Sequence, residues 1–525
     1  TQPDVTVPLQ AAIETATASG AIAYLPPAVY GVSAPLELPA GATVCGFPGA
    51  TILSASIDRG AWAPGRALVE IVGVGGVGVH DLVLDHRGDE RFTTDTALTF
   101  TMLLSNTAND VVSNVVFRDP GAAVGAPSAP ALLLLARDPA DPPWLTDTGT
   151  HVGQVGAVEG VEILDSRFEL GVGANDWFAI RLHSMFGRSP ETYIHHVDRV
   201  TIRGCAFTGD YAWNTVELAG GGVYGNTVAS STFDGATLAH VDLDKGTYGN
   251  SVLDNVVTRA GRPTALYTVL PEIGYVPRVA AFADHGFDGV LRNADNVFDG
   301  NVVLAMVEHA PAVVDPAAVT SDEGGFYLAY TDRPTLIGNE VVDVYGGLRG
   351  TGILFEDDVA DARLERNVIG AVGLPRTVAY GIRTANASTG IEAPTVYANE
   401  VYVAAAGITL VGSATGSDGY VVDGNWVDSR STGLAAVSLL GVDAPVLTRN
   451  ATVGGYHGYE LVAPGLIGDA NLADAAASYS FAVWADATLT GSHVSGPGQV
   501  GVPFPHCLIG PGAHVTATGG TLLCP

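Results

Sequence analysis

The chain has 525 residues, of which only 15% are charged, and its formal net charge is −31. Nucleic-acid binding needs clustered Lys and Arg, so this charge excludes nucleic acid as an expected partner. A strongly acidic surface also repels polyanionic substrates unless a cation or a local Arg cluster intervenes, which favours a neutral substrate. The sequence has no run of about eighteen apolar residues, so we expect no membrane partner.

The first fifty residues predict one short helix followed by short strands. Residues 8–19 carry apolar side chains at helical spacing, and Gly20 ends the pattern. Residues 23–30 and 36–46 read as strands separated by Pro and Gly turns. A solenoid exposes apolar core at its ends, so we interpret the helix as a cap lying across a first coil.

This opening resembles the N-terminus of pectate-lyase-like right-handed β-helix enzymes. The similarity lies in the letters LQAAI at residues 9–13, LPP at residues 25–27 and the following Tyr30. It implies an architecture and says little about the substrate.

A repeated motif begins near residue 109, in which a small or polar residue, usually Asn, stands between β-forming residues. Close neighbours among these positions are 24 to 26 residues apart. That period, with short strands and no helices, predicts an all-β fold, a right-handed parallel β-helix with a short N-terminal capping helix. We interpret the Asn column as structural, because stacked amides hydrogen-bond from coil to coil. The motif positions are Asn114, Ser166, Cys205, Ser231, Asn255, Asn301, Asn339, Asn367, Asn399, Asn425 and Asn450.

We expect one domain over residues 1–525. Residues 1–50 form the N-terminal cap and first coil, residues 51–455 form coils with loop insertions, and residues 456–525 form final coils and a C-terminal cap. Of the four cysteines, Cys205 lies in an apolar strand and reads as a buried free thiol. Cys507 and Cys524 flank the last strands and can close a loop of a secreted protein, and we expect an extracellular location.

Three segments read as the same strand on successive coils: residues 179–182, 215–218 and 240–243. Each has one polar residue between apolar neighbours, and these polar residues are Arg181, Glu217 and Asp242. Strand side chains alternate between faces, so the three are predicted to stack on one outer face. The residues predicted to fill the core are Ile180, Val216, Val241, Ile353, Ile382 and Ile408.

Glu217 and Asp242 are the main catalytic candidates. On adjacent coils about 4.8 Å apart, their carboxyl groups would lie within reach of the separation that glycoside-cleaving carboxylate pairs use. Two close carboxylates push their pKa values apart, so one holds a proton while the other is ionised. Arg181 would keep its neighbour charged or grip a sugar hydroxyl. The alternative is a structural ladder of Arg, Glu and Asp without catalysis.

Further candidates surround this column. Trp177 and Trp213 each lie four residues before a polar position, which suits either a platform for sugar rings or a packing stack. Asp210 lies in the turn before the Glu217 strand and is the preferred second acid, although Asp favours turns for local reasons. The remaining substrate-binding candidates are Asp176, His183, Asn214, Asp244 and Lys245, the only lysine in the chain.

Residues 175–181 (NDWFAIR), 214–222 (NTVELAGGG) and 242–246 (DLDKG) are similar to the central coils of inulin fructotransferases. The resemblance implies a trimeric β-helix that forms difructose anhydride from inulin without a metal or other cofactor. It also implies that Glu217 and Asp210 form the acidic pair. The spacing between these two residues and the long C-terminal tail are possible departures from the family.

Two other function classes compete with this interpretation. A polyuronate lyase or polygalacturonase-type hydrolase would need a Ca²⁺ site or clustered Arg and Lys in its groove. A non-enzymatic spike or adhesin would have an even, uncharged outer face, which fits residues 175–245 poorly. No cysteine spacing resembles a zinc site, and no histidine has a partner in sequence that defines a metal set.

Overall fold

The structure of the protein is a computed structural model. The structure describes residues 4–55, 66–87, 100–118, 130–138, 140, 155–169, 178–184, 195–211, 213–235, 237–260, 279–286, 291–306, 323–344, 350–372, 378–385, 390–412, 419–474, 477–495 and 506–524. The chain divides into two compact units, unit 1 (residues 1–277 and 309–319) and unit 2 (residues 278–308 and 320–525). The one-domain boundaries expected from the sequence stay a prediction.

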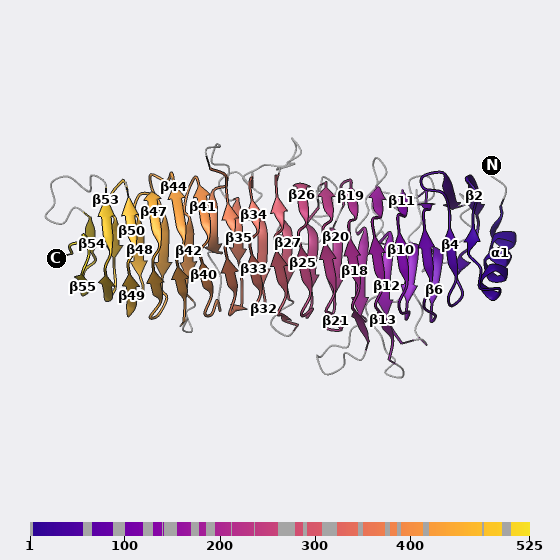
Figure 1. Cartoon of the computed structure of the whole chain (residues 1–525). Helices are drawn as coiled ribbons and strands as arrows, with labels where there is room; N and C mark the ends of the chain where they lie inside the picture. The colour runs from indigo at the N-terminus through magenta and orange to yellow at the C-terminus, as the bar shows by residue number, and fades with distance from the viewer. Residues whose placement is uncertain are drawn as a thin grey trace, which may run out of the picture. The chain divides into compact units, whose positions relative to one another are not determined.

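Unit 1 begins with helix α1 (Thr6–Ala18), as the apolar spacing predicts. Leu9 and Ile13 are buried on its inner side. The Asp4 carboxylate accepts hydrogen bonds from the Thr6 backbone N–H and hydroxyl, at 3.0 and 2.6 Å, which satisfies one free donor of the first turn. Figure 1 shows α1 beside the first strands of the unit, in the position expected of a cap. Within the described ranges, no helix combines the length and the apolar character that crossing a bilayer requires.

The strands of unit 1 build three long parallel sheets, and each coil contributes one strand to each sheet (Figure 1). The first sheet contains β1 (Ala23–Tyr24), β4 (Thr43–Cys45), β7 (Gly78–His80), β10 (Val111–Ser113), β14 (Glu162–Leu164), β18 (Thr201–Arg203), β22 (Thr227–Ala229) and β25 (Ser251–Leu253). The second contains β2 (Ala28–Val32), β5 (Thr51–Ala55), β8 (Val83–Asp85), β11 (Val116–Arg118), β15 (Arg167–Glu169), β19 (Ala206–Thr208), β23 (Thr232–Asp234) and β26 (Val256–Arg259).

The third sheet of unit 1 carries the candidate site. It contains β3 (Leu36–Glu37), β6 (Ala67–Val72), β9 (Phe100–Ser105), β12 (Leu132–Ala136), β16 (Ile180–Ser184), β20 (Asn214–Ala219) and β24 (Ala239–Asp244). A short fourth sheet contains β13 (Ala157–Glu159), β17 (His196–Asp198) and β21 (Val223–Tyr224). The sequence period did not reveal this fourth sheet.

Unit 2 repeats the plan with three long parallel sheets and one short sheet. The first contains β29 (Val297–Asp299), β33 (Thr335–Ile337), β37 (Arg363–Glu365), β40 (Thr395–Tyr397), β43 (Val421–Asp423), β46 (Val446–Thr448), β49 (Leu466–Asp469), β52 (Ala487–Thr490) and β55 (Val515–Thr518). The second contains β30 (Val302–Val303), β34 (Glu340–Val341), β38 (Val368–Ile369), β41 (Glu400–Val403), β44 (Trp426–Ser429), β47 (Ala451–Gly454), β50 (Leu472–Asp474) and β53 (His493–Ser495).

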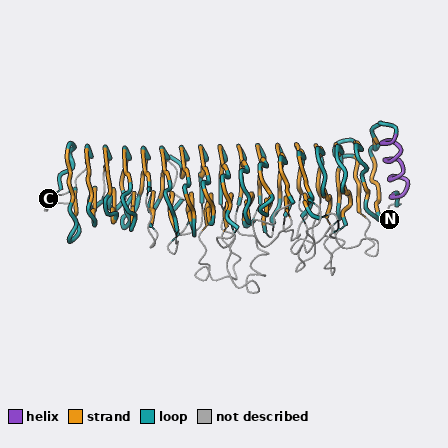
Figure 2. Tube along the Cα trace, turned by 90° about the horizontal axis from the view of Figure 1, so that it is seen from below, coloured by secondary structure: helices purple, strands orange, loops and turns teal. Residues whose placement is uncertain are grey.

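The third sheet of unit 2 contains β27 (Val279–His285), β31 (Glu323–Ala329), β35 (Thr351–Phe355), β39 (Tyr380–Thr384), β42 (Ile408–Val411), β45 (Val437–Leu440), β48 (Tyr459–Val462), β51 (Phe481–Val483) and β54 (Cys507–Ile509). The short sheet contains β28 (Asn293–Ala294), β32 (Thr331–Asp332) and β36 (Val359–Ala360). Figure 2 shows strands and turns alternating coil after coil within each unit. Both units are right-handed parallel β-helices, which confirms the predicted fold class.

Stacked side chains fill the interior of the coils. In unit 1, Phe117, Phe168, Phe207 and Phe233 stack with ring centroids 4.5, 4.9 and 4.7 Å apart. The isoleucines and valines predicted for the core are fully buried in both units. This packing is the continuous apolar column that a solenoid needs, because one coil cannot bury its own apolar face.

The predicted Asn column is confirmed most fully in unit 2. The Oδ1 atom of each Asn accepts from the backbone and side-chain amides of the Asn one coil earlier, at 2.9–3.1 Å. The ladder runs through Asn301, Asn339, Asn367, Asn399, Asn425, Asn450 and Asn471.

One position assigned to the Asn motif is wrong. Asn114 is exposed with φ +53°, and its side chain donates to Asp81. Val115 occupies the inner position instead, where its backbone N–H donates to Ser166 Oγ at 3.2 Å. An Asn in a left-handed turn and an Asn in the ladder look alike in sequence, because both stand between β-forming residues.

The C-terminal strands of unit 2 are held by a disulfide between Cys507 and Cys524. Cys205 is a buried free thiol, as predicted, and burial raises its pKa to about 12. Cys45 is a free thiol with intermediate exposure.

Candidate functional site

Arg181, Glu217 and Asp242 lie in one column on the third sheet of unit 1. Strand pairing places Arg181 beside Glu217 on β16 and β20, and Glu217 beside Asp242 on β20 and β24. The predicted stacking order is therefore confirmed. Each residue stands between two apolar neighbours that are fully buried in the core, so the column belongs to the opposite, outer face of the sheet.

The same column extends toward the N-terminus and changes its chemistry on the way. It continues through Leu133, Leu103, Glu70 and Glu37 on β12, β9, β6 and β3. The Glu37 side chain is 71% exposed, which identifies the face as the outer one. Leu103 and Leu133 are completely buried on that face. The outer face is therefore buried at the coils of Leu103 and Leu133. The charged residues of the site begin on the next strand, at Arg181.

Arg181 and Glu217 form an ion pair that is hidden from solvent. The Arg181 Nε atom contacts Glu217 Oε2, and the two side chains are 15% and 2% exposed. The Arg181 guanidinium also lies over the Phe178 ring, 5.0 Å from its centroid. Removing a carboxylate from water is costly unless a charged or hydrogen-bonding partner replaces the lost solvent. Arg181 supplies that partner for Glu217.

Asp242 is also buried, at 3% exposure. The side-chain amide of Asn214, at the start of β20, donates to Asp242 Oδ2 at 2.5 Å. This bond ties the beginning of one strand to the outer side chain of the next. It gives the predicted substrate-binding residue Asn214 a positioning contact within the site.

Asp244 and Lys245 extend the site at the C-terminal end of β24. Lys245 Nζ lies 3.1 Å from Asp244 Oδ2, and the lysine side chain is 33% exposed. Burial opposes its ammonium charge, but Asp244 and Glu217 outweigh this and raise the pKa of Lys245. Lys245 holds φ +58°, a conformation that non-glycine residues rarely adopt. The only lysine in the chain is therefore a cation placed beside the acids by a turn.

Two more predicted residues lie on the strands of the site. His183 is completely buried, and strand pairing aligns it with Ala219 and Asp244. Trp213 is half-buried, and its backbone carbonyl accepts from the Thr237 hydroxyl and the Leu238 N–H, both at 2.7 Å. Asp176 and Trp177 lie outside the described residues, so the predicted pair of tryptophans stays a prediction.

Asp210 occupies a different environment from Glu217. Its side chain is 53% exposed and lies 3.7 Å from Arg259 Nη2, while Arg259 Nε contacts Asp234 at 3.1 Å. Asp210 and Asp234 therefore share one arginine at the surface. Asp242, in contrast, is brought into register with Glu217 by the sheet itself.

Sequence reasoning gave no role to His240, which supports the site from the same strand as Asp242. Its Nε2–H donates to the Arg259 carbonyl at 2.9 Å, and its Nδ1 accepts from the Thr215 hydroxyl at 3.0 Å. Burial lowers the pKa of His240 to about 4, so the ring is neutral at pH 7. The contact with Thr215 joins β20 to β24 near the two acids. The sequence indicates this pair only through the strand register, because Thr215 and His240 directly precede Val216 and Val241, which are aligned.

The arrangement suits acid–base chemistry. Two carboxylates, Glu217 and Asp242, lie on adjacent strands, and such strands are about 4.8 Å apart. The charged group consists of three acids and two cations: Glu217, Asp242, Asp244, Arg181 and Lys245. If all five are ionised, the group carries one excess negative charge. Low exposure strengthens every electrostatic interaction among them.

Solved structures of two other proteins match this chain to different degrees. The tailspike protein of E. coli bacteriophage HK620, in complex with a pentasaccharide, matches with a TM-score of 0.51 and 12% identity, over 98% of this chain and 78% of that chain. The A-module of the mannuronan C-5 epimerase AlgE6 from Azotobacter vinelandii matches with a TM-score of 0.36 and 13% identity, over 100% and 96%. No protein-family model and no curated protein matches the sequence. The tailspike likeness agrees with the β-helix that the strand pairing defines.

Proposed function

We propose that this protein is a carbohydrate-active enzyme that cleaves a neutral glycan at the column of Arg181, Glu217 and Asp242. The observation that carries the proposal is the register of Glu217 with Asp242, two buried carboxylates on adjacent strands of an outer face. A purely structural ladder has no need to bury two acids side by side, because burial penalises each charge. The tailspike protein of the same fold is bound to a pentasaccharide, which supports a carbohydrate ligand.

The best candidate reaction is intramolecular transfer on a fructan, which releases a cyclic difructose dianhydride. Asp242, in its protonated form, donates its proton to the departing glycosidic oxygen. Glu217, ionised against Arg181, removes the proton from a hydroxyl group of the same chain. That oxygen then attacks the anomeric carbon, so one C–O bond forms as another breaks and no water is consumed. Two carboxylates with divided roles are the usual means of cleaving glycosidic bonds.

The charges of the site favour a neutral substrate. Arg181 and Lys245 are each paired with an acid, and their side chains keep 15% and 33% exposure. Both cations already contact carboxylates of the chain, those of Glu217 and Asp244, so a neutral sugar meets less repulsion there than a second set of carboxylates would. The remaining substrate-binding candidates are Asp176, Trp177, His183, Trp213, Asn214 and Asp244, and Asp210 is kept as a third catalytic candidate.

The likeness to inulin fructotransferases supports inulin as the first fructan to test. We further propose, on that resemblance, an extracellular homotrimer that needs no cofactor. The trimer is tested by light scattering of the purified full chain, where a single monomeric species would contradict it.

The direct test of the reaction is incubation of the protein with inulin, levan, arabinan, dextran and pectin, followed by chromatography and mass spectrometry. The proposal expects a product from inulin whose mass is one water less than that of a fructose disaccharide. Linear fructo-oligosaccharides would instead indicate hydrolysis. No product from any neutral glycan would contradict the proposal.

A polyuronate lyase or polygalacturonase-type hydrolase is the second candidate, and the closeness of Arg181 and Lys245 favours it. Arg181 contacts Glu217, and the charge of Glu217 helps to raise the pKa of Lys245. Arginine and lysine side chains are the groups that hold carboxylates such as those of uronates. A product from pectin that absorbs in the ultraviolet, with activity lost in EDTA, would favour this candidate over the fructan reaction.

A further inference from the structure

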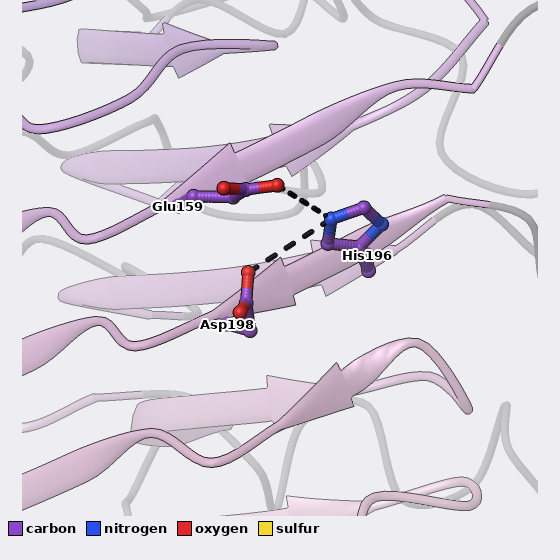
Figure 3. A group of neighbouring side chains, drawn as sticks. All are labelled: Glu159, His196 and Asp198. Atoms are coloured by element: carbon purple, nitrogen blue, oxygen red, sulfur yellow. Dashed lines mark hydrogen bonds and ion pairs between the residues drawn. The ribbon is translucent and has the colours of Figure 1, made fainter.

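A second polar cluster lies on the short sheet of β13, β17 and β21 in unit 1. Strand pairing aligns Glu159 with Asp198, and His196 stands two residues before Asp198 on β17. Residues two apart on a strand share a face, and paired residues on adjacent strands do so too. Glu159, His196 and Asp198 therefore point to the same side of the sheet, and Figure 3 shows their side chains converging.

The three side chains present their donor atoms to one small volume. His196 Nε2 lies 2.8 Å from Glu159 Oε1 and 3.9 Å from Asp198 Oδ1. One donor atom from each residue lies within 4.8 Å of the other two. A divalent ion binds such atoms at about 2.0–2.2 Å, so its ligands lie about 3 Å or more from one another. Small rotations of the side chains would bring all three into contact with a single ion.

Asp198 places an unsatisfied carboxylate oxygen at the cluster. The residue is only 9% exposed, and its Oδ1 atom is buried without a hydrogen-bond partner among the described residues. That oxygen is the one that faces His196. A buried carboxylate oxygen without a donor is costly, and native structures usually satisfy such atoms with a proton donor, water or an ion.

Arg199 occupies the other side of both carboxylates. Its Nη2 atom contacts Glu159 Oε2 at 2.6 Å, and its Nε atom contacts Asp198 Oδ2 at 3.2 Å. The guanidinium thus engages the outer oxygens and leaves Glu159 Oε1 and Asp198 Oδ1 directed toward His196. Contacts of this kind orient the ligands of metal sites. With a neutral imidazole, two carboxylates and one arginine leave an excess negative charge for a cation to balance.

Two tyrosines flank the cluster in the same column. Tyr224 pairs with Asp198, and its ring stacks on that of Tyr248 with centroids 4.8 Å apart. The His196 and Tyr224 ring centroids are 6.3 Å apart. The cluster therefore has an aromatic wall on one side.

We propose that Glu159, His196 and Asp198 form a binding site for a divalent first-row transition ion such as Zn²⁺ or Mn²⁺. An imidazole nitrogen with two carboxylate oxygens suits such ions, whereas Ca²⁺ and Mg²⁺ prefer ligand sets made entirely of oxygen. Water completes the coordination. The site is separate from the residues of the proposed glycan chemistry, so its existence does not depend on that proposal. The sequence did not predict it, since no histidine had a recognisable partner.

The test is isothermal titration calorimetry of the metal-stripped full chain with Zn²⁺, Mn²⁺, Ca²⁺ and Mg²⁺ in separate experiments. We expect one Zn²⁺ or Mn²⁺ site per chain and at least tenfold weaker binding of Ca²⁺ and Mg²⁺. The variants His196→Ala and Asp198→Asn should each weaken the transition-ion site at least tenfold. His493→Ala, at an exposed histidine of β53 in unit 2, should leave it unchanged.

A second readout separates ligand loss from misfolding. Co²⁺ bound to His196 should give visible absorption bands in the wild type that Asp198→Asn, a substitution of equal size, alters while the far-ultraviolet circular dichroism stays native. No saturable binding of any transition ion to the wild type would overturn the proposal. Equal affinity in wild type and His196→Ala would overturn it as well, and would leave the cluster as an ion-pair network only.

Discussion

Arg181 and Glu217 form a buried ion pair between adjacent strands of one sheet, with the arginine held over the Phe178 ring. We predict that Arg181→Gln lowers the free energy of unfolding by about 3–5 kcal/mol, because it leaves Glu217 buried without its cation. Urea denaturation measures the loss. The double variant Arg181→Met with Glu217→Leu should recover most of it, since two apolar side chains do not carry the desolvation cost. A double variant that is no more stable than Arg181→Gln would contradict an interaction between the two residues.

His240 makes the stability of the protein depend on pH. Its folded pKa of about 4 lies below the ordinary value of about 6.5. Between these two pKa values His240 is protonated in the unfolded chain and neutral in the folded chain. Protonation therefore favours unfolding as the pH falls, and this effect is absent above about pH 6.5. The full effect is about 3 kcal/mol at pH 4 relative to pH 7. His240→Gln should remove that part of the pH dependence in urea denaturation. Identical pH profiles for variant and wild type would show that His240 does not titrate as described.

Asn399 is one rung of the amide ladder in unit 2. Its Oδ1 accepts from the backbone and side chain of Asn367, and its Nδ2 donates to Leu364 O and Asn425 Oδ1. Asn399→Ala leaves several buried polar groups without partners, at about 1–3 kcal/mol each, so we predict a loss of at least about 2 kcal/mol. Thermal unfolding measures it. Thr488→Ala, at an exposed position of β52, is the matched control and should change stability by less than about 0.5 kcal/mol. Equal losses of stability in Asn399→Ala and Thr488→Ala would show that the Asn ladder does not stabilise the fold.

The disulfide between Cys507 and Cys524 closes the C-terminal strands of unit 2. Its residues are 17 apart, and a cross-link of that length stabilises by about 3 kcal/mol in the chain-entropy model. Cys507→Ser with Cys524→Ser should therefore expose the C-terminal end to protease at temperatures where the wild type is resistant. Cys45→Ser, which removes a free thiol, should leave the cleavage rate unchanged. Unchanged cleavage in the double variant would show that packing alone holds the last coils.

Much of the fold follows from two periodicities in the sequence. The coil repeat separates Glu217 from Asp242 by one turn, and the alternation of strand faces puts both on the same side. A longer stretch of chain separates Arg181 from Glu217. Their alignment was still predictable, because each has the same apolar neighbours, Ile or Val before it and Leu after it.

Burial and long-range partners did not follow from the sequence. Alternation predicts which side of a sheet a residue takes, but not that Glu217 retains only 2% exposure on the outer side. The cluster of Glu159 and His196 was missed for a related reason. Its residues are 37 apart, on a short extra sheet whose strands show no repeat of their own. Asn114 shows the opposite error, a residue assigned to the ladder that does not belong to it. It lies in a turn, but its neighbours in sequence are those expected for a ladder Asn.

The central claim is that Glu217 performs chemistry, and Glu70 provides the control for it. Both glutamates lie in the same outer column of unit 1, both are at most 5% exposed, and both pair with an arginine, which for Glu70 is Arg66 at 2.8 Å. The measurement is the turnover of inulin by Glu217→Gln and Glu70→Gln, with folding checked by circular dichroism. We predict that Glu217→Gln lowers turnover by at least about 10²–10⁴-fold, as expected for loss of a catalytic acid or base, while Glu70→Gln keeps it. Wild-type turnover in a folded Glu217→Gln variant would contradict the account.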